Sequence, residues 1–548
     1  MGDVSNERTT SAMTGRARLR EILPPAGAGA LCGLLAAGTS LAVAELAAAA
    51  VREEARPVNA VGGAVIDRTP APVKDWAIEN FGTNDKLVLQ LGILLLLGLF
   101  AVTVGVLALR FRRAAALAVL GFGLFGAVVA AGRPEGAGPD ALPSLAGAVA
   151  GATVLYLLVG PSLRMVPGPP GRAEREGEAP ARVLTGFERR RFVVAATTVA
   201  AASAGAGLLG RRLNAAGRAR AAASRTALSL PAPASRAGTV PAGAELRVPG
   251  LGPLITPNRD FYRIDTALTV PRVDAESWRL TVRGKGVTRP LELGFADLLE
   301  RELVERRITL TCVSNPVGGR YTGNASWIGV RLAELLAEAG VRPPSRGGPA
   351  DQLIARSVEG MTLGSPVEAV MDGRDALLAV GMNGEPLPFV NGFPVRMVVP
   401  GLYGYVSACK WLTELELTTF EEYDPYWVQR GWAREAPIKT MSRIDTPRGL
   451  DTLPAGRVAV AGVAWAQRTG IDRVEVRVDG GAWSDAELAE EDSVDTWRQW
   501  VWMWDATPGR HSLEVRATDR SGSTQTADRV GTVPDGATGR HAVVVNVN

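Results

Sequence analysis

Residues 307–319 read Arg-Ile-Thr-Leu-Thr-Cys-Val-Ser-Asn-Pro-Val-Gly-Gly, and this stretch decides how the soluble part of the chain is interpreted. Apolar and polar residues alternate from Arg307 to Cys312, which predicts a β-strand that ends at the cysteine. The residues that follow are typical of a loop. Cys312 then has three interpretations: a small buried hydrophobic residue, a nucleophile that needs a histidine base, or a thiolate ligand for a redox metal.

The composition narrows these choices. The chain has 548 residues, 3 cysteines and 2 histidines. So few cysteines exclude a disulfide framework and a four-cysteine zinc or iron–sulfur site, and two histidines argue against a multi-histidine metal centre. His511 and His541 lie about 200 residues beyond Cys312 in another predicted domain, and we interpret both as structural. A length prior of ~150 residues per domain predicts three or four domains.

Charge is divided unevenly along the chain. Residues 1–240 carry 26 Lys+Arg and 16 Asp+Glu, whereas residues 241–548 carry 34 and 40. The basic half also holds the long apolar runs, which indicates a membrane-associated part joined to a soluble part. Because the soluble half is acidic, we expect no nucleic-acid partner.

Residues 1–210 are predicted to form a transmembrane anchor, since a helix needs about 20 apolar residues to cross a bilayer. About five spans are expected: 27–51, 87–109, 114–131, 142–160 and 192–210. No histidine lies in them, so we expect no haem in this chain. Glu45, inside the first span, is either a functional acid or a helix-end residue facing the bundle, and we favour the second. Residues 211–250 are predicted to be a linker.

The basic loops predict the orientation of the anchor. With the N-terminus in the cytoplasm, segments 1–26, 110–113 and 161–191 hold 14 Lys/Arg, and the two opposite segments hold 6. The soluble part is then expected outside the cytoplasm, although four arginines soon after residue 210 oppose this. Residues 188–194, Glu-Arg-Arg-Arg-Phe-Val-Val, resemble a twin-arginine export signal, and the alternative is an ordinary membrane helix with basic flanks.

The soluble part begins at residue 251 and reads as an α+β domain, because strands and helices mix without a βαβ rhythm. Trp278–Gly286 predicts a strand and hairpin turn. Phe295–Arg301 and Leu332–Gly340 predict short helices, the second ending at a glycine C-cap.

Several ordered motifs in this part resemble the sulfite oxidase family of molybdopterin enzymes. They are Thr309–Asn315, Gly381–Pro388, Asn391–Gly401 and Lys410-Trp-Leu. The similarity runs from about Thr256 to about Thr440, so we predict a molybdopterin-binding catalytic domain over 251–440. A second similarity, to the immunoglobulin-like dimerisation domain of that family, covers 441–548.

The resemblance implies a cofactor with molybdenum on a single pterin, the metal being bound by Cys312. It implies further cofactor-binding residues at Asn258, Tyr262, Arg263, Asn391, Arg396, Ser407 and Lys410. Arg263 and Arg396, with Cys312, form the expected catalytic set, because guanidinium groups suit an anionic cofactor or substrate. We interpret Cys409 as a packing residue and Cys32 as apolar filler in the first span.

Three departures from the animal and plant sulfite oxidases leave the substrate open. Those enzymes have histidine where this chain has Asn391, and Arg-Asn-His where it has Arg263-Ile-Asp265. Their active-site tyrosine falls in a segment that here reads Glu359-Gly-Met-Thr-Leu-Gly-Ser-Pro. Asn391 is nearer to the bacterial methionine-sulfoxide reductase branch. Arg320 could join Arg263 and Arg396 in a site for sulfite.

The last 108 residues predict a β-sandwich. Val474, Val476 and Val478 alternate with charged residues, and Trp500, Trp502 and Trp504 fall on one strand face. Pro508-Gly509 predicts another hairpin. The tryptophans are expected to pack against the catalytic domain or a second subunit.

The sequence therefore predicts a multi-domain protein: a helical transmembrane bundle, an α+β molybdopterin domain and an immunoglobulin-like β-sandwich. We expect a membrane-anchored, extracytoplasmic, sulfite oxidase-like molybdenum oxidoreductase for two-electron oxygen-atom transfer on a small oxyanion, or else an S- or N-oxide reductase, such as a methionine-sulfoxide reductase, of the same family. An external electron carrier, a cytochrome or the quinone pool, and a homodimer through 441–548 are the expected partners. The alternative is a non-catalytic surface protein with a degenerate cofactor domain.

Overall fold

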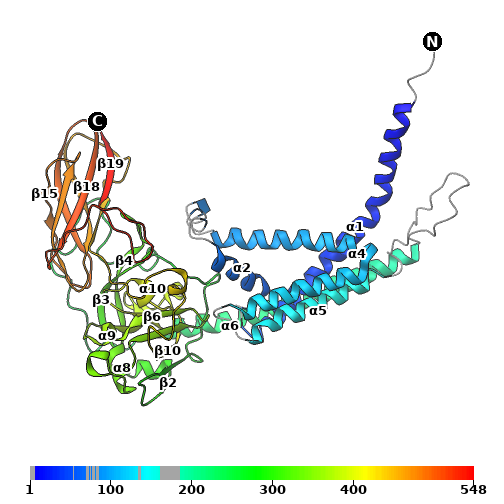
Figure 1. Ribbon diagram of the computed structural model, residues 1–548, viewed down its shortest axis with the longest axis horizontal. Coiled ribbons are helices and arrows are strands. Elements are labelled where there is room, and N and C mark those ends of the chain that lie inside the picture. The colour runs from blue at the N-terminus through cyan, green and yellow to red at the C-terminus, as the bar shows by residue number, and fades with distance from the viewer. Residues whose placement is uncertain are drawn as a thin grey trace, which may run out of the picture. The chain divides into compact units, whose positions relative to one another are not determined.

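The computed structural model describes residues 7–52, 55–69, 85–133, 138–160 and 186–548, with positions 73, 76, 80 and 81. The chain divides into two compact units (Figure 1): residues 1–217 with 266–269, and residues 218–265 with 270–548. The side chains of the basic segments 1–25 and 161–190, on which the predicted orientation and export signal depend, lie outside the described residues.

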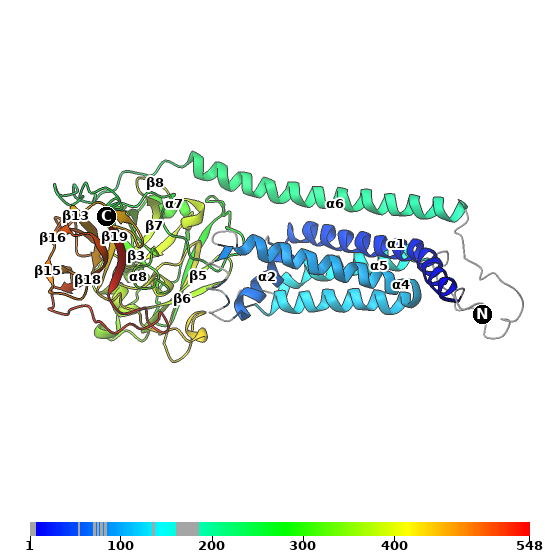
Figure 2. The same ribbon diagram turned by 90° about the horizontal axis from the view of Figure 1, so that it is seen from above.

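The first unit is helical. Its helices are α1 (Glu7–Ala48), α2 (Pro57–Arg68), α4 (Asp85–Ala131), η3 (Gly138–Asp140), α5 (Ala141–Leu158) and α6 (Gly186–Ala227). Within the described residues, four helices are long and apolar enough to cross a membrane: α1, α4, α5 and α6. In Figure 2, α1, α4 and α5 lie side by side, and buried Cys32 of α1 packs in their apolar core, as expected.

Helix α4 covers both the second and the third predicted spans, and it folds back on itself at Phe111. The backbone of Phe111 leaves the helical region, with φ −128° and ψ 60°. The rings of Phe100 and Phe122 stack with centroids 4.8 Å apart, whereas a straight helix would separate these residues by about 33 Å. The sequence prediction of five helices thus differs from the observed four because two of them meet at this reversal.

Glu45 faces other helices of the bundle. Its carboxylate lies 2.9 Å from the Arg56 guanidinium and accepts a hydrogen bond of 3.2 Å from the Asn214 amide. This placement agrees with the interpretation of Glu45 as a bundle-facing residue, because an apolar medium favours paired charges.

The α+β part of the second unit contains two sheets. The first has the order β2-β1-β10-β5-β6, with bounds Leu291–Gly294, Arg279–Gly284, Leu412–Thr418, Gln352–Ser357 and Thr362–Pro366. The second has the order β3-β4-β7-β8, with β9 beside β7, and bounds Val304–Thr311, Thr322–Arg331, Leu377–Met382, Glu385–Pro386 and Arg396–Val398. The short helices are α7 (Phe295–Leu299), α8 (Leu332–Glu338), η5 (Pro344–Arg346), α9 (Val367–Met371), η6 (Phe389–Asn391), α10 (Gly404–Ser407) and η7 (Val428–Arg430).

The local predictions for this part are confirmed. Strand β3 ends directly before Cys312, and its inward residues Ile308 and Leu310 are buried. Strands β1 and β2 form the expected hairpin, and α7 and α8 occupy the two predicted helices. No described part of the chain repeats a βαβ unit, so the α+β class also holds.

Residues 441–548 form a sandwich of two sheets, drawn in orange and red in Figure 1. One has the order β11-β13-β17-β16, with bounds Met441–Thr446, Gly456–Trp465, Arg498–Ala506 and Glu487–Leu488. The other has the order β12-β19-β18-β14-β15, with bounds Thr452–Leu453, His541–Val547, Gly509–Asp519, Ile471–Val478 and Ser484–Asp485. Trp500 and Trp504 are buried between them and Trp502 packs against the same core.

The turn at Pro508-Gly509 differs from its prediction. Strands β17 and β18, which it joins, belong to different sheets, so the chain crosses the sandwich there and makes no hairpin. The alternating apolar residues of both strands face the shared core, and that burial outweighs pairing between sequence neighbours.

The predicted linker 211–250 is also more ordered than expected. Helix α6 continues to Ala227, because alanine and arginine favour helix and the first proline follows only at position 231. Beyond it, the Ala234 amide donates to Leu303 O at 2.8 Å and the Leu246 amide donates to the Gln499 side chain at 2.7 Å. Residues 228–250 therefore pack along the second unit.

His541 lies at the start of β19, where its Nδ1 accepts a hydrogen bond of 3.0 Å from the Ile444 amide. Burial, together with the charges of Arg443 and Arg529, lowers its pKa to about 4, and Asp445 opposes this effect. The folded protein thus keeps this ring neutral between pH 6.5 and 4, whereas the unfolded chain protonates it, and stability falls as pH decreases through that window.

We expect His541→Gln to remove this pH dependence. From pH 7 to pH 5 the wild type should lose about 2 kcal/mol more unfolding free energy than the variant, measured by denaturant titration of the full-length protein in detergent. The control is His511→Gln. Asp479 raises the pKa of His511, so stability from that residue is present below pH 6.5 and declines above it. Identical pH profiles for wild type and His541→Gln would contradict the assignment.

Candidate active site

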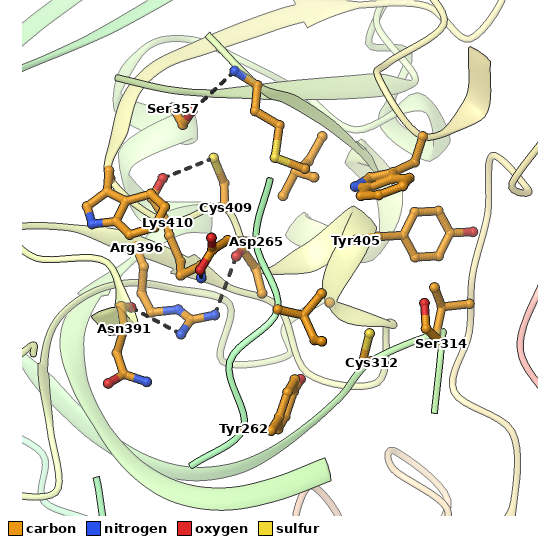
Figure 3. A pocket seen from close by; sticks show the side chains of 18 of the residues that line it. Tyr262, Asp265, Cys312, Ser314, Ser357, Asn391, Arg396, Tyr405, Cys409 and Lys410 are labelled. Carbon is orange, nitrogen blue, oxygen red and sulfur yellow. Dashed lines mark hydrogen bonds and ion pairs between the residues drawn. The ribbon is translucent and has the colours of Figure 1, made fainter. Parts of the chain in front are cut away.

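A pocket opens in the second unit where the ends of several strands meet. It encloses about 890 Å³ of non-protein space, part of it open to solvent. Figure 3 shows Cys312, Ser314 and Tyr405 on one side and Asn391, Arg396 and Lys410 on the other. Five residues expected from the sequence line it: Tyr262, Cys312, Asn391, Arg396 and Lys410.

Cys312 stands at the carboxyl end of β3. Its amide donates to Tyr321 O at 2.8 Å, its carbonyl accepts from the Asn315 amide at 3.1 Å, and the residue is only 8% exposed. Burial raises the pKa of its thiol, and hydrogen bonds with Ser314 and the charge of Lys410 oppose that rise. A bound metal cation would remove this proton, because a coordinating thiol is deprotonated.

Arg396 is the first residue of β9, and it carries a buried charge into the pocket. Its guanidinium donates to Asn391 O at 3.1 Å and to Ala408 O at 3.4 Å, and lies 4.9 Å from the centre of the Trp327 ring. Among the described residues no carboxylate forms an ion pair with it. Burial lowers its pKa to about 10, so it remains positive at neutral pH.

Lys410 also projects into the pocket, and it is paired. Its Nζ lies 2.8 Å from Asp265 Oδ2, and that carboxylate accepts a second hydrogen bond of 2.8 Å from Arg263. Burial lowers the pKa of Lys410, and Asp265 opposes this effect. One carboxylate thus serves two cations, which leaves net positive charge beside the pocket.

Gly392 allows the two cationic segments to meet. Its φ is +110°, and a Cβ at this position would lie 3.0 Å from the Cβ of Lys410 and 3.1 Å from that of Arg396. Any larger residue would push these segments apart. The glycine in the Asn391–Arg396 segment therefore has a steric reason.

Two buried polar atoms near this point have no hydrogen-bond partner in the part of the chain described: Asn391 Oδ1 and Arg396 Nε. Such atoms are costly when unsatisfied. Together with the Cys312 thiol and the Lys410 ammonium, they offer one soft metal ligand, cationic donors and an amide acceptor. This donor set fits a molybdenum–pterin cofactor bearing a phosphate.

The rest of the pocket wall is aromatic and apolar. Tyr405 packs with its ring centroid 5.7 Å from that of Trp432, and its hydroxyl donates to Ala433 O at 2.7 Å. Trp427 lies with its ring 6.4 Å from that of Trp432. All three line the pocket, with Met361 and Leu363 beside them.

Three of the expected residues lie outside this lining. The Asn258 amide donates to Glu385 at 2.6 Å and accepts from Asn383 at 2.8 Å. Ser407 is fully buried, and its hydroxyl donates to Leu402 O at 2.9 Å. Arg263 contacts the pocket through Asp265. Arg320, considered as a further cation for sulfite, is exposed and is not among the lining residues either.

Sequence reasoning missed several lining residues. Asp265 stands in a segment noted only for its departure from the animal and plant enzymes, and Tyr405 lies between two motifs. The contacts of both residues depend on partners elsewhere in the chain. Glu359 is buried. It begins the segment in which the animal and plant enzymes have their active-site tyrosine, and no motif pointed to it. Trp427 and Trp432 belong to no motif. The only signal for them is that residues 423–432 are rich in aromatic side chains, which could have suggested an aromatic wall for the pocket.

Residues 267–427 match the oxidoreductase molybdopterin binding domain family. Mitochondrial sulfite oxidase of Rattus norvegicus is 32% identical over 288 residues, covering 46% of this chain and 52% of that protein. NADH nitrate reductase 1 of Oryza sativa is 27% identical over 317 residues, covering 47% and 34%. The structure of sulfane dehydrogenase SoxCD from Paracoccus pantotrophus is 26% identical and covers 54% of this chain and 84% of that chain, with a TM-score of 0.46. The chain spans about half the length of the mammalian relatives it matches.

The Asp265–Lys410 pair generates a prediction about stability. Asp265→Asn should destabilise the second unit by about 3–5 kcal/mol, because it leaves a buried ammonium without its carboxylate. Tryptophan fluorescence during denaturation of the full-length protein reports this unit, since all tryptophans but Trp76 follow residue 270.

The control is Glu414→Gln, which disrupts a pair with the half-exposed Arg283 and should cost less than about 1 kcal/mol. Adding Lys410→Met to Asp265→Asn should restore part of the loss. Equal effects of the two single variants would show that the Asp265 pair is not a buried one.

Proposed function

Because the chain belongs to the sulfite oxidase family of molybdopterin-dependent oxidoreductases, we propose that it is a membrane-anchored, extracytoplasmic molybdenum enzyme for two-electron oxygen-atom transfer. The observation that carries this proposal is the Arg396 guanidinium, buried without a carboxylate partner among the described residues, in the pocket that Cys312 lines. A buried cation needs an anion, and a phosphate-bearing cofactor supplies one.

In this proposal Cys312 would be the metal ligand, and Arg396, Lys410, Asn391 and Tyr262 would bind the cofactor. When bound, the molybdenum–pterin group would supply the oxygen-atom and electron transfer. Arg396 would offset its negative charge, and Lys410, whose position is set by Asp265, would act as a point charge.

The residues outside the lining take supporting roles. Arg263 is partly exposed at the edge of the pocket, and it acts on the pocket through its ion pair with Asp265. Asn258 holds the entry segment by its bonds to Glu385 and Asn383. Ser407 fixes the end of α10, from which the chain passes to Cys409 and Lys410.

We propose five membrane crossings for the anchor, with the two arms of α4 crossing separately. Each arm has about the 20 residues that a crossing needs, and Arg110, Arg112 and Arg113 flank the reversal at Phe111. The N-terminus is then cytoplasmic and the second unit lies outside the cytoplasm. Electrons pass to or from a cytochrome or the quinone pool, and residues 441–548 form a homodimer.

The first candidate substrate class is a small oxyanion such as sulfite. A second class, an organic S- or N-oxide, is favoured by the charge and the wall of the pocket. Its charged lining residues are two acids, Asp265 and Glu359, and two bases, Arg396 and Lys410. Arg263, paired with Asp265 at the edge of the pocket, adds one positive charge. A phosphate-bearing cofactor would offset that charge, which disfavours a further anion such as sulfite. A neutral sulfoxide avoids that repulsion and could pack on Trp427 and Trp432. Its reduction to a thioether and water would consume two electrons and two protons, with the electrons from the external carrier.

Elemental analysis tests the proposed enzyme. Purified wild-type protein should hold close to one molybdenum per chain, and Cys312→Ala should lose most of it because the soft ligand is gone. Cys409→Ala, which removes a buried thiol from the same pocket, is the matched control and should retain the metal. A wild type without molybdenum would end the proposal, and full metal in Cys312→Ala would end the ligand assignment.

Substrate assays separate the two classes. With aryl methyl sulfoxide and a reduced dye, Trp432→Ala should raise KM about 10-fold through loss of aromatic packing, with little effect on dimethyl sulfoxide. Trp483→Ala, in the sandwich, should change neither value. Turnover of sulfite alone would reject the second class in favour of a sulfite-oxidising enzyme.

A further inference from the structure

Strand β3 carries Cys312 at its end, and it is an edge strand. In the sheet order β3-β4-β7-β8 one side of β3 pairs with β4 and the other side faces away from the sheet. Edge strands present unpaired backbone groups that a protein must cover. Here Ala234 and Ser235 pair with the start of β3, and residues of the β-sandwich cover its second half, up to Thr309.

Thr309, three residues before the cysteine, is bonded to the sandwich through every polar group it has. Its amide donates to Asp495 O at 3.0 Å, its carbonyl accepts from Gln467 Nε2 at 2.5 Å, and its hydroxyl accepts from the Trp497 amide at 2.8 Å. Thr309 is fully buried. Gln467 donates a further bond of 3.1 Å to Asp495 O, which joins the contacts into one cluster.

Arg307, two residues earlier on the same face of β3, forms a bidentate ion pair with Asp492. The two N–O distances are 2.5 and 2.6 Å, and the side chains are 12% and 2% exposed. Bidentate pairs of this kind fix orientation as well as position.

The loop after Cys312 is held by the same domain. Arg443 donates to Gly319 O at 2.9 Å and is itself oriented by Asp445 at 2.6 Å. Gly318 has φ +79°, and a Cβ there would overlap the ring of His541. The cysteine therefore lies on a short stretch of chain that the sandwich anchors on both sides.

We propose that the β-sandwich positions the Cys312 thiol, with Gln467, Asp492 and Arg443 as positioning residues that hold β3 and the following loop. This inference rests on the proposed role of Cys312 as metal ligand. A ligand held this rigidly keeps its geometry whether or not the metal is bound, as a precise site requires.

The experiment compares Gln467→Met with Gln499→Met in the full-length, cofactor-free protein in detergent. Both glutamines are buried in the sandwich and make two side-chain bonds, but Gln499 holds residues 246 and 252 and makes no bond to β3. The rate of Cys312 alkylation by iodoacetamide is measured by peptide mass spectrometry, with Cys409 as the internal reference.

Gln467→Met should speed Cys312 alkylation about 5- to 10-fold, as expected for one lost buried hydrogen bond, and leave Cys409 unchanged. Gln499→Met should change neither. Arg443→Gln, which acts from the other side of the cysteine, should reproduce the effect. Equal Cys312 rates in Gln467→Met and Gln499→Met, or a parallel rise at Cys409, would overturn the positioning role.

The metal-loaded protein gives a second readout. The electron paramagnetic resonance lines of Mo(V) should broaden in Gln467→Met and match the wild type in Gln499→Met, because only the first loosens the ligand. Unaltered lines in Gln467→Met would overturn the link to the metal. A wild type that binds no molybdenum would overturn the proposed function, whereas the alkylation rates would still decide the mechanical role of the sandwich.

Discussion

A buried guanidinium without a carboxylate is the constraint on which the catalytic unit depends. Removing one ion from water costs several kcal/mol unless a partner offsets it, and the described residues offer Arg396 only carbonyl oxygens and the Trp327 ring. The neighbouring Lys410, in contrast, has a carboxylate partner, because Asp265 Oδ2 lies 2.8 Å from its Nζ. The two cations differ in this respect, and the absence of a carboxylate partner for Arg396 among the described residues is why we propose that it binds the anionic cofactor.

The geometry around that charge follows from several elements that converge, and no single element contains the site. Cys312 comes from the end of β3, Arg396 from β9, and Lys410 from the turn between α10 and β10. Gly392 is the point where the last two touch, since its missing side chain leaves room for both. Supports lie behind Cys312 and Arg396: the sandwich covers the edge of β3 nearest Cys312, and β9 pairs with the fully buried strand β7. Precision in the pocket thus depends on packing well outside it.

The sequence was informative for features that depend on residues close together in the chain. The strand before Cys312 and the helices near Phe295 and Leu332 could be predicted because each depends on near neighbours in the chain. Asn391, Arg396 and Lys410 were expected from the family resemblance, and the structure places all three in the pocket lining. Asp265 could not be predicted, because its partner lies 145 residues away, and Asn258 and Ser407 proved to bond to backbone and side chains outside the pocket. Trp427 and Trp432 carry no motif. The reversal at Phe111 and the extension of α6 to Ala227 were set by side-chain contacts and helix propensity, which composition alone did not resolve.

Charge in the pocket finally connects the cofactor to the choice of substrate. Asp265 and Glu359 balance Arg396 and Lys410 in the lining, and Arg263 adds one positive charge at its edge, which the proposed phosphate-bearing cofactor would offset. A second anion would then need further cations, and Arg320 is exposed and is not among the lining residues. The opposite wall of the pocket consists of Tyr405, Trp427 and Trp432. These aromatic side chains would instead favour a substrate with apolar surface. Under the proposed function, this balance favours uncharged organic oxides as substrates, and Cys312, directly after β3, is the proposed metal ligand.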